Sequence, residues 1–232
     1  MRISAHELIA GYGKLPVLHG VDFQVETGEF VAILGANGAG KTTLMKTLAR
    51  ALPVMGGDLK LDEKSIVKWR AHDAAAAGIA YVPQEHNVFA DLSVAENLSL
   101  SAGKKHDSEL FEMIYDRFGF LADRADQQAG SLSGGERQAL AVSMAFVSQP
   151  SLLLLDEPTT GLSPIVCQTL TDWIVEIAAA GVTIVWIVEQ NPEPVLAAAS
   201  RAYVIDGGQV VYEGAANSIS GSEAMALVLQ QH

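Results

Sequence analysis

Gly35-Ala36-Asn37-Gly38-Ala39-Gly40-Lys41-Thr42 is the stretch of sequence that decides the fold. It matches G-x-x-x-x-G-K-[ST], the pattern of a phosphate-binding loop, at every fixed position. The apolar run over residues 30–34 predicts a buried strand before the loop, and residues 42–50 predict a helix after it. The loop therefore lies where a strand passes into a helix N-terminus. Its backbone N–H groups and the helix dipole can together bind an anion.

Two side chains of this loop would act on a bound nucleotide. Lys41 is expected to reach the β- and γ-phosphates, and the Thr42 hydroxyl to take one position on Mg²⁺. The alternative is an ordinary glycine-rich turn between a strand and a helix. Because the bare pattern rarely occurs by chance with the correct strand and helix on its two sides, we expect nucleotide binding.

A second stretch, Leu152-Leu153-Leu154-Leu155-Asp156-Glu157, supplies acids for the same chemistry. Its leucines predict a strand that is buried on both faces, and the two acids follow at the C-terminal end of that strand. Asp156 could hold Mg²⁺ opposite the phosphate loop, while Glu157 could orient a water molecule for attack on the γ-phosphate. The alternative is a strand that simply ends in acids, and the phosphate loop upstream disfavours it.

Three other side chains could meet a nucleotide. Gln84 follows a predicted strand over residues 79–82, and Gln190 follows another over residues 182–188. Open α/β sheets bind ligands at this end of their strands. Tyr12 lies in the predicted turn Gly11-Tyr12-Gly13. Taken alone it is a surface turn residue, but with the phosphate loop downstream its ring is expected to stack on a base.

The pattern between residues 85 and 150 is helical and resembles a subdomain inserted into an α/β chain. Ser133 and Glu136 form a capping box at the start of a helix that extends to about residue 148. Gly134 and Gly135 leave that helix N-terminus without side chains. Such a terminus is an anion site if it is exposed, and a plain helix start otherwise.

The remaining elements follow from alternation, turn residues and caps. We expect strands over residues 2–10 and 17–25, a short strand over 58–61 after Gly56-Gly57, a helix over 164–180, a hairpin over 203–206 and 209–212, and a last helix from 223.

The composition agrees with one large globular α/β domain. The chain has 232 residues, of which 49% are hydrophobic and 18% are charged. Its formal net charge of -12, without any basic run, argues against a nucleic-acid groove. A single cysteine, Cys167, excludes an intrachain disulfide and suits a reducing cytosol. The longest apolar stretch, residues 177–188, is shorter than the roughly 20 residues that a membrane-spanning helix needs.

These motifs, in this order, resemble the ATP-binding subunits of ABC transporters over nearly the whole chain. Residues 35–42 correspond to the Walker A loop, Gln84 to the Q-loop glutamine, residues 132–136 to the signature motif, and residues 152–157 to Walker B with its catalytic acid. The resemblance implies an α/β fold, a P-loop NTPase (RecA-like) core with an N-terminal antiparallel β subdomain and an inserted α-helical subdomain. It implies a single ABC ATPase domain over 1–232, with the core in 1–84 and 150–232 and the helical subdomain in 85–149.

Within the family, the chain is most similar to the shorter ATPase subunits of branched-chain amino-acid importers. The chain stops soon after the core, Ser163 replaces the usual Asp of the D-loop, and Gln190 replaces the usual switch histidine. Glu136 also ends the signature where Gln is commoner. Related urea and amide importers share these traits, so the substrate stays open. Gln190 is neutral, so any contact it makes with the γ-phosphate would be an uncharged hydrogen bond.

The resemblance also implies the cofactors and the residues that hold them. ATP would be bound by Tyr12, Val17, Asn37, Gly38, Ala39, Gly40, Lys41, Thr42 and Thr43. Mg²⁺ would be held by Thr42, Gln84 and Asp156, and catalysis would use Glu157, Gln84 and Gln190. Ser133, Gly134 and Gly135 would bind the ATP of a partner, because two subunits of this family meet head to tail.

The partners implied are a second ATPase subunit, expected to be a non-identical paralogue, and integral membrane permease subunits that contact residues 85–128. A binding protein outside the membrane would act indirectly, and no nucleic acid is expected. The chain would then lie at the cytoplasmic face of the cell membrane. A soluble ABC ATPase without a permease is the alternative from another class. Glu157 disfavours a third alternative, a regulatory nucleotide-binding module with little hydrolysis.

Overall fold

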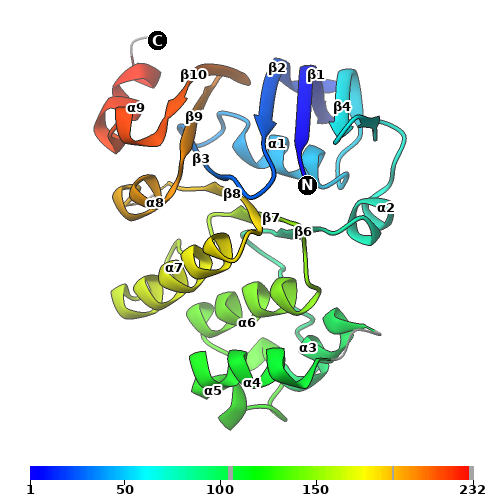
Figure 1. The fold of residues 1–232 in the computed structure, drawn as a ribbon, viewed down its shortest axis with the longest axis vertical. Helices are drawn as coiled ribbons and strands as arrows, with labels where there is room; N and C mark the ends of the chain where they lie inside the picture. Colours follow the sequence, from blue (N-terminus) through cyan, green and yellow to red (C-terminus); the bar gives the residue numbers. More distant parts are fainter. Residues whose placement is uncertain (104–106, 190, 230–232) are drawn as a thin grey trace.

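The computed structural model describes residues 1–103, 107–189 and 191–229, and these form two β-sheets with helices around them (Figure 1). The four-stranded antiparallel sheet has the order β2 (Leu15–Val25), β1 (Ile3–Tyr12), β4 (Val54–Leu61), β5 (Lys64–Ser65). The six-stranded sheet has the order β10 (Gln209–Ala215), β9 (Arg201–Asp206), β3 (Phe30–Leu34), β8 (Thr183–Ile187), β7 (Leu152–Asp156), β6 (Ile79–Val82). All neighbours in this second sheet are parallel except β10, which pairs antiparallel with β9.

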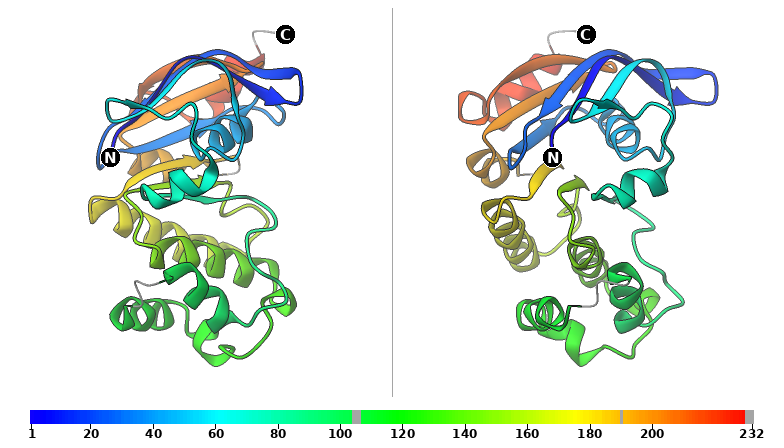
Figure 2. Two further views of the ribbon diagram at one scale, coloured as in Figure 1. Left: turned by 90° about the vertical axis from the view of Figure 1, so that its right-hand side faces the viewer. Right: turned by 45° about the vertical axis from the view of Figure 1, so that its right-hand side comes forward.

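The helices divide between the two ends of the molecule. Near the sheets lie α1 (Lys41–Leu48), α2 (Ala71–Ala76), α7 (Pro164–Ala179), α8 (Glu193–Ala198) and α9 (Gly221–Leu229). Figures 1 and 2 show a second group gathered at the end opposite the antiparallel sheet: α3 (Val94–Ala102), α4 (Ser108–Arg117), α5 (Gly119–Asp123) and α6 (Gly134–Val147). Short 3₁₀ turns cover Ala129–Ser131 and Ala216–Ser218. None of the helices in the described ranges is long and apolar enough to cross a membrane.

Strand β7 shows how the six-stranded sheet separates two hydrophobic cores. Its residues are all buried, and their side chains alternate between the two faces of the sheet. Leu152 and Leu154 pack with α1 and the antiparallel sheet. Leu153 and Leu155 pack into the other core, with α6 and α7. A strand that is buried on both faces needs apolar residues at every position, which explains the run of four leucines.

Two details of the antiparallel sheet differ from the sequence prediction. Tyr12 is the last residue of β1 and pairs with Leu15, so the turn is Gly13-Lys14 and not Gly11-Tyr12-Gly13. Gly56-Gly57 lies inside β4 and does not lead into it. A Cβ on Gly57 would stand 2.2 Å from the carbonyl oxygen of Glu7, and the pairing of β1 with β4 shifts register here. Glu7 and Leu8 of β1 lie opposite Gly57 alone, so β1 carries a bulge here and Gly57 leaves room for it.

The other predicted elements are confirmed with small shifts of their ends, including the strands at residues 79–82 and 152–156 and the hairpin of β9 and β10. The predicted capping box of Ser133 with Glu136 is formed, and Ser93 and Glu96 form another at the start of α3. The division of the chain at residues 84/85 and 149/150 stays a prediction.

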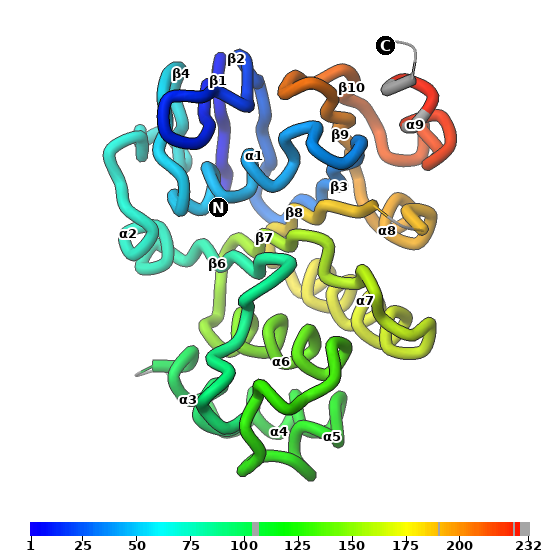
Figure 3. The backbone as a smooth tube through the Cα atoms, turned by 180° about the vertical axis from the view of Figure 1, so that it is seen from behind, coloured from blue at the N-terminus to red at the C-terminus, as the bar shows by residue number. Residues whose placement is uncertain are grey.

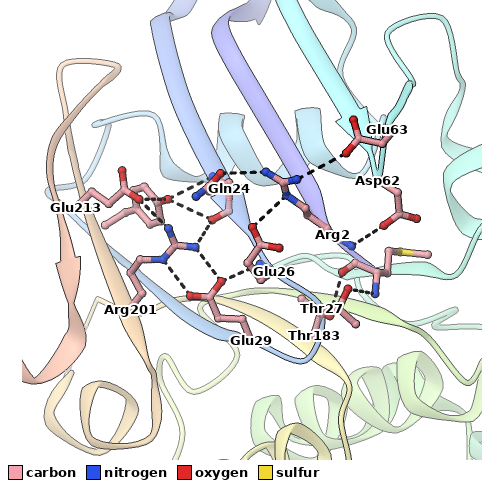
Figure 4. A network of polar contacts seen from close by, with 12 residues as sticks. Arg2, Gln24, Glu26, Thr27, Glu29, Asp62, Glu63, Thr183, Arg201 and Glu213 are labelled. Atoms are coloured by element: carbon pink, nitrogen blue, oxygen red, sulfur yellow. Dashed lines mark hydrogen bonds and ion pairs between the residues drawn. The ribbon is translucent and has the colours of Figure 1, made fainter.

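An ion-pair network joins the two sheets (Figure 4). Arg201 on β9 donates to both carboxylate oxygens of Glu29, at 2.9 Å from Nε and 2.8 Å from Nη2. It also donates to Glu213 on β10 and to the carbonyl oxygen of Gln24 on β2. Both Arg201 and Glu29 are largely buried, with side chains 17% and 15% exposed. The network therefore fastens the β9–β10 hairpin to the antiparallel sheet.

Arg201→Ala is expected to lower the free energy of unfolding by about 3 kcal/mol, because it leaves the largely buried carboxylate of Glu29 without its partner. Urea unfolding followed by circular dichroism measures this change. Arg2→Ala is the control, because Arg2 pairs with Glu26 in a more exposed position and should contribute less than about 1 kcal/mol. Equal losses in the two variants would contradict the special role of Arg201.

Candidate functional site

The phosphate loop leaves β3 at a glycine that no other residue can replace. Gly35 has φ 147°, and a Cβ on it would stand 2.1 Å from the carbonyl oxygen of Ile205 on β9. Gly40 occupies the N-cap position of α1 with φ 108° and has no side chain to cap the helix. The first N–H groups of α1 thus stay available to an anion, which the dipole of the helix also favours.

Lys41 lies folded back over this loop. Its Nζ donates to the carbonyl oxygens of Gly35 at 2.8 Å and Ala36 at 3.0 Å. Burial lowers the pKa of Lys41, and the charges of Glu157, Glu189 and Asp156 act in the opposite direction. A buried ammonium is unfavourable unless opposite charges lie close to it. The carboxylates of this site therefore stabilise the charged form of Lys41, and the ammonium stabilises the carboxylates.

Asp156 ends β7 directly beside the phosphate loop. It is 1% exposed and accepts hydrogen bonds on both oxygens, from the Thr42 hydroxyl at 3.1 Å and from the Tyr81 hydroxyl at 3.0 Å. Burial raises the pKa of Asp156, and the bonds from Tyr81 and Thr42 lower it. A hydroxyl and a carboxylate at this distance are oxygen donors of the kind that Mg²⁺ takes together with nucleotide phosphates, so the residues fit the metal. Within the described residues, no three His, Cys, Asp or Glu form a metal site without such phosphates.

Glu157 follows in a strained conformation. Its φ is 51°, in the left-handed region, and its N–H donates to the carbonyl oxygen of Ile187. The carboxylate accepts from Gln84 Nε2 at 2.9 Å and from the Thr160 hydroxyl at 3.3 Å. Burial and the neighbouring carboxyl of Glu189 raise the pKa of Glu157 to about 7. A carboxylate that titrates near neutral pH is suited to accept a proton from water.

A cavity of about 380 Å³ opens above these groups, and we call it the phosphate-loop cavity. Its lining consists of Tyr12, Val17, Asn37, Gly38, Ala39, Gly40, Lys41, Thr42, Thr43, Gln84 and Glu157. All the residues that the sequence proposed for binding ATP within one chain therefore meet here. Tyr12 is 48% exposed, and Lys46 Nζ lies 5.8 Å from the centre of its ring.

Helix α6 begins within the signature motif, so we call it the signature helix, and it lies away from the phosphate-loop cavity. Figure 3 shows α6 and α1 on opposite sides of β6, β7 and β8. Ser133 caps α6, and its side chain accepts from the N–H of Glu136, which in turn pairs with Arg124. Among the described residues that line the phosphate-loop cavity, none belongs to the signature motif. A Cβ on Gly134 would meet no atom within 4 Å, so this helix N-terminus is open to a ligand from outside.

Gln190, proposed for catalysis, lies outside the described residues. Its neighbour Glu189 lies within the described residues, and the carboxyl of Glu189 contributes to the raised pKa of Glu157.

A family model described as ABC transporter matches residues 18–160, which is more than half of the chain. The chain belongs to this family. The ABC ATPase is 40% identical over 203 residues to the high-affinity branched-chain amino acid transport ATP-binding protein of Pseudomonas aeruginosa, covering 86% of this chain and 87% of that protein. It is 36% identical over 216 residues to a probable branched-chain amino acid transport ATP-binding protein of Archaeoglobus fulgidus, covering 92% of each chain.

The fold has solved counterparts as well. A nucleotide-free ATP-binding cassette from an ABC transporter matches with a TM-score of 0.78 at 25% identity, covering 99% of this chain and 96% of that one. The family assignment and the α/β fold expected from the sequence are thereby confirmed.

Sequence reasoning missed two features of the ABC ATPase site. The sequence placed Tyr81 on a buried strand but did not predict the hydrogen bond from its hydroxyl to Asp156. The position of a tyrosine three residues before Gln84 was the one sequence feature that could have indicated this bond. Asn87 Nδ2 donates to Gln138 Oε1 at 2.5 Å and to the carbonyl oxygen of Pro83 at 3.2 Å. This pair ties the segment after Gln84 to the signature helix, and its members are too far apart in the chain for any local pattern to reveal it.

Tyr12→Ala is expected to weaken ADP and GDP binding alike, by roughly 1–3 kcal/mol, because the ring would stack on any base. Isothermal titration calorimetry measures both affinities. Tyr12→Phe keeps the ring and should bind nearly as well as the unchanged chain. Unchanged affinity in Tyr12→Ala would mean that the ring is only the end of a hairpin strand.

Proposed function

We propose that this ABC ATPase binds Mg·ATP in the phosphate-loop cavity, shares that ATP with a second ATPase subunit, and hydrolyses it to drive import of branched-chain or other amino acids. The observation that carries the proposal is the separation within one chain of two phosphate-binding elements. The phosphate loop and the acids share one cavity, whereas the open N-terminus of α6 lies away from it.

Each residue of the cavity has a role in this proposal. The N–H groups of residues 38–43 and the Lys41 ammonium bind the phosphates, and Tyr12 and Val17 contact the base. Thr42, Asp156 and Gln84 hold Mg²⁺, which would neutralise charge on the phosphates. Glu157 accepts a proton from the attacking water, and Gln84 keeps its carboxylate in place through the bond at 2.9 Å. We assign Gln190 a hydrogen bond to the γ-phosphate.

The second subunit completes the site from outside. Ser133, Gly134 and Gly135 present a helix N-terminus without large side chains, which suits a γ-phosphate held by the partner's loop. ATP then holds two subunits together, and its hydrolysis releases them. The partner is a second ATPase subunit, which we expect to be a non-identical paralogue.

Transport requires integral membrane subunits, which we place against residues 85–128 at the cytoplasmic face of the membrane. The names of the bacterial relative and of the archaeal relative support branched-chain amino acids as the substrate class. A binding protein would act indirectly, through the permeases. Copurification with integral membrane proteins tests this part, because a soluble ABC ATPase would be recovered without them.

Glu157→Gln is expected to keep ATP binding and to reduce turnover at least 100-fold, because the amide cannot accept the proton. ATP would then persist between the subunits, so an ATP-dependent dimer should become detectable by light scattering. Phosphate release at saturating Mg·ATP measures the turnover. Near-normal hydrolysis by this variant would exclude Glu157 as the base.

The pH dependence of kcat/KM reports the pKa of this base in the free enzyme. With the pKa of Glu157 at about 7, activity should rise as pH increases through 7, because only the carboxylate accepts a proton. Glu189→Gln removes the neighbouring carboxyl, so the rise should move to lower pH. Burial remains and keeps the pKa of Glu157 above its ordinary value.

The control for this prediction is Glu63→Gln, which removes one charge at a side chain that is 90% exposed and remote from the cavity. Its profile should match that of the unchanged protein. A rise that stays at the same pH in Glu189→Gln would show that the Glu157 carboxyl does not set the profile.

A further inference from the structure

We propose that Tyr81 is a positioning residue for the metal-binding carboxylate: its hydroxyl fixes the rotation of Asp156, so that one carboxylate oxygen stays beside Thr42. The inference rests on the proposed function, because it assigns Tyr81 a part in metal binding at the same site. Tyr81 is not among the residues that line the phosphate-loop cavity in the described structure, so it acts through Asp156 and not on the nucleotide.

The sheet brings the two residues together. Strands β6 and β7 are parallel neighbours, and Tyr81 is paired with Leu154. Side chains two residues apart on a strand share a face, so Asp156 projects on the same face as Leu154 and its neighbour Tyr81. The Tyr81 hydroxyl spans the remaining gap and donates to Asp156 Oδ2 at 3.0 Å.

The two hydrogen bonds on Asp156 divide its oxygens between two partners. Oδ2 accepts from Tyr81, and Oδ1 accepts from Thr42 at 3.1 Å. A carboxylate that is held at only one oxygen can still turn about its Cβ–Cγ bond, whereas one that is held at both cannot. While the Thr42 hydroxyl donates its hydrogen bond to Asp156, its oxygen lone pairs would remain available to a metal. Tyr81 therefore holds the carboxylate oxygen of Asp156 that Thr42 does not hold.

The electrostatics keep Tyr81 in the donor state. An ordinary phenol has a pKa of about 10, so the Tyr81 hydroxyl carries its proton at physiological pH. Asp156 is 1% exposed, so a hydrogen bond from a neutral hydroxyl offsets part of the cost of burying its carboxylate. A neutral phenol thus stabilises an ionised carboxylate without placing a competing cation beside the metal.

The structure offers a matched control in Tyr203. This tyrosine is fully buried, whereas Tyr81 is partly buried, and its hydroxyl likewise donates to a carboxylate, Glu213 Oε1, at 2.8 Å. It belongs to β9 and to the network that joins the two sheets, away from the phosphate-loop cavity. Tyr81→Phe and Tyr203→Phe therefore each remove one hydroxyl that donates to a carboxylate, and only the first touches Asp156.

The test measures Mn²⁺ binding by electron paramagnetic resonance, with the full chain saturated with ADP at pH 8. We expect Tyr81→Phe to weaken Mn²⁺ binding about tenfold, the loss typical of a group that orients a metal ligand. Metal-free ADP affinity should be unchanged in this variant, which also shows that the cavity is folded. Tyr203→Phe should bind Mn²⁺ like the unchanged protein. In steady-state hydrolysis, Tyr81→Phe should need more Mg²⁺ for half-maximal rate and approach normal kcat at saturation.

The outcomes separate the inference from the proposed function. Equal Mn²⁺ affinity in Tyr81→Phe and the unchanged chain would overturn the role of Tyr81 and leave the nucleotide site intact. Equal losses in both tyrosine variants would also overturn it, because the effect would then be a general one on the fold. Failure of the unchanged chain to bind Mn²⁺ with ADP would contradict the proposed function itself.

Discussion

The parallel pairing of β3, β8, β7 and β6 is the constraint on which the site depends. Parallel strands end at one edge of a sheet, so the groups that follow them converge although they are far apart in the sequence. Gly35 follows β3, Gln84 follows β6 after Pro83, and Asp156 ends β7, directly before Glu157. Any shift of register by one residue would turn Asp156 to the other face of the sheet and separate it from Thr42.

This convergence places opposite charges in a region with little water. Lys41, Asp156 and Glu157 are each at least nine-tenths buried. An isolated charge there would be very unfavourable, but the ammonium and the carboxylates offset one another, and hydroxyls and an amide donate to the acids. The left-handed backbone of Glu157 fits the same pattern, since strain of this kind persists where the surrounding structure fixes it. The sheet that carries these groups is buried on both faces and can support that strain.

The sequence predicted what local patterns encode and missed what tertiary contacts decide. The phosphate loop, the leucine strand and the capping boxes each have a short signature, and the structure contains them. Gly56-Gly57 was expected to precede a strand and instead lies inside it, because the bulge of β1 at Glu7 that it accommodates depends on the partner strand. The hydroxyl of Tyr81 and the pair of Asn87 with Gln138 depend on contacts across the fold, which no window of sequence contains. The trans role of the signature residues needs a second chain and stays a proposal.

The affinity of the isolated chain for ADP tests the central claim most directly, namely that the phosphate loop serves its own chain and the signature helix serves another. ADP lacks the γ-phosphate that would join two subunits, so calorimetry of the dilute chain reports the phosphate-loop cavity alone. We predict that Lys41→Ala loses more than about tenfold in ADP affinity, the loss of a charge-assisted bond to phosphate. Gly134→Glu places its side chain in open space and should leave ADP affinity unchanged while it stops hydrolysis in the assembled protein. An equal loss of ADP affinity in both variants would contradict the account, because the signature helix would then act on its own chain's nucleotide.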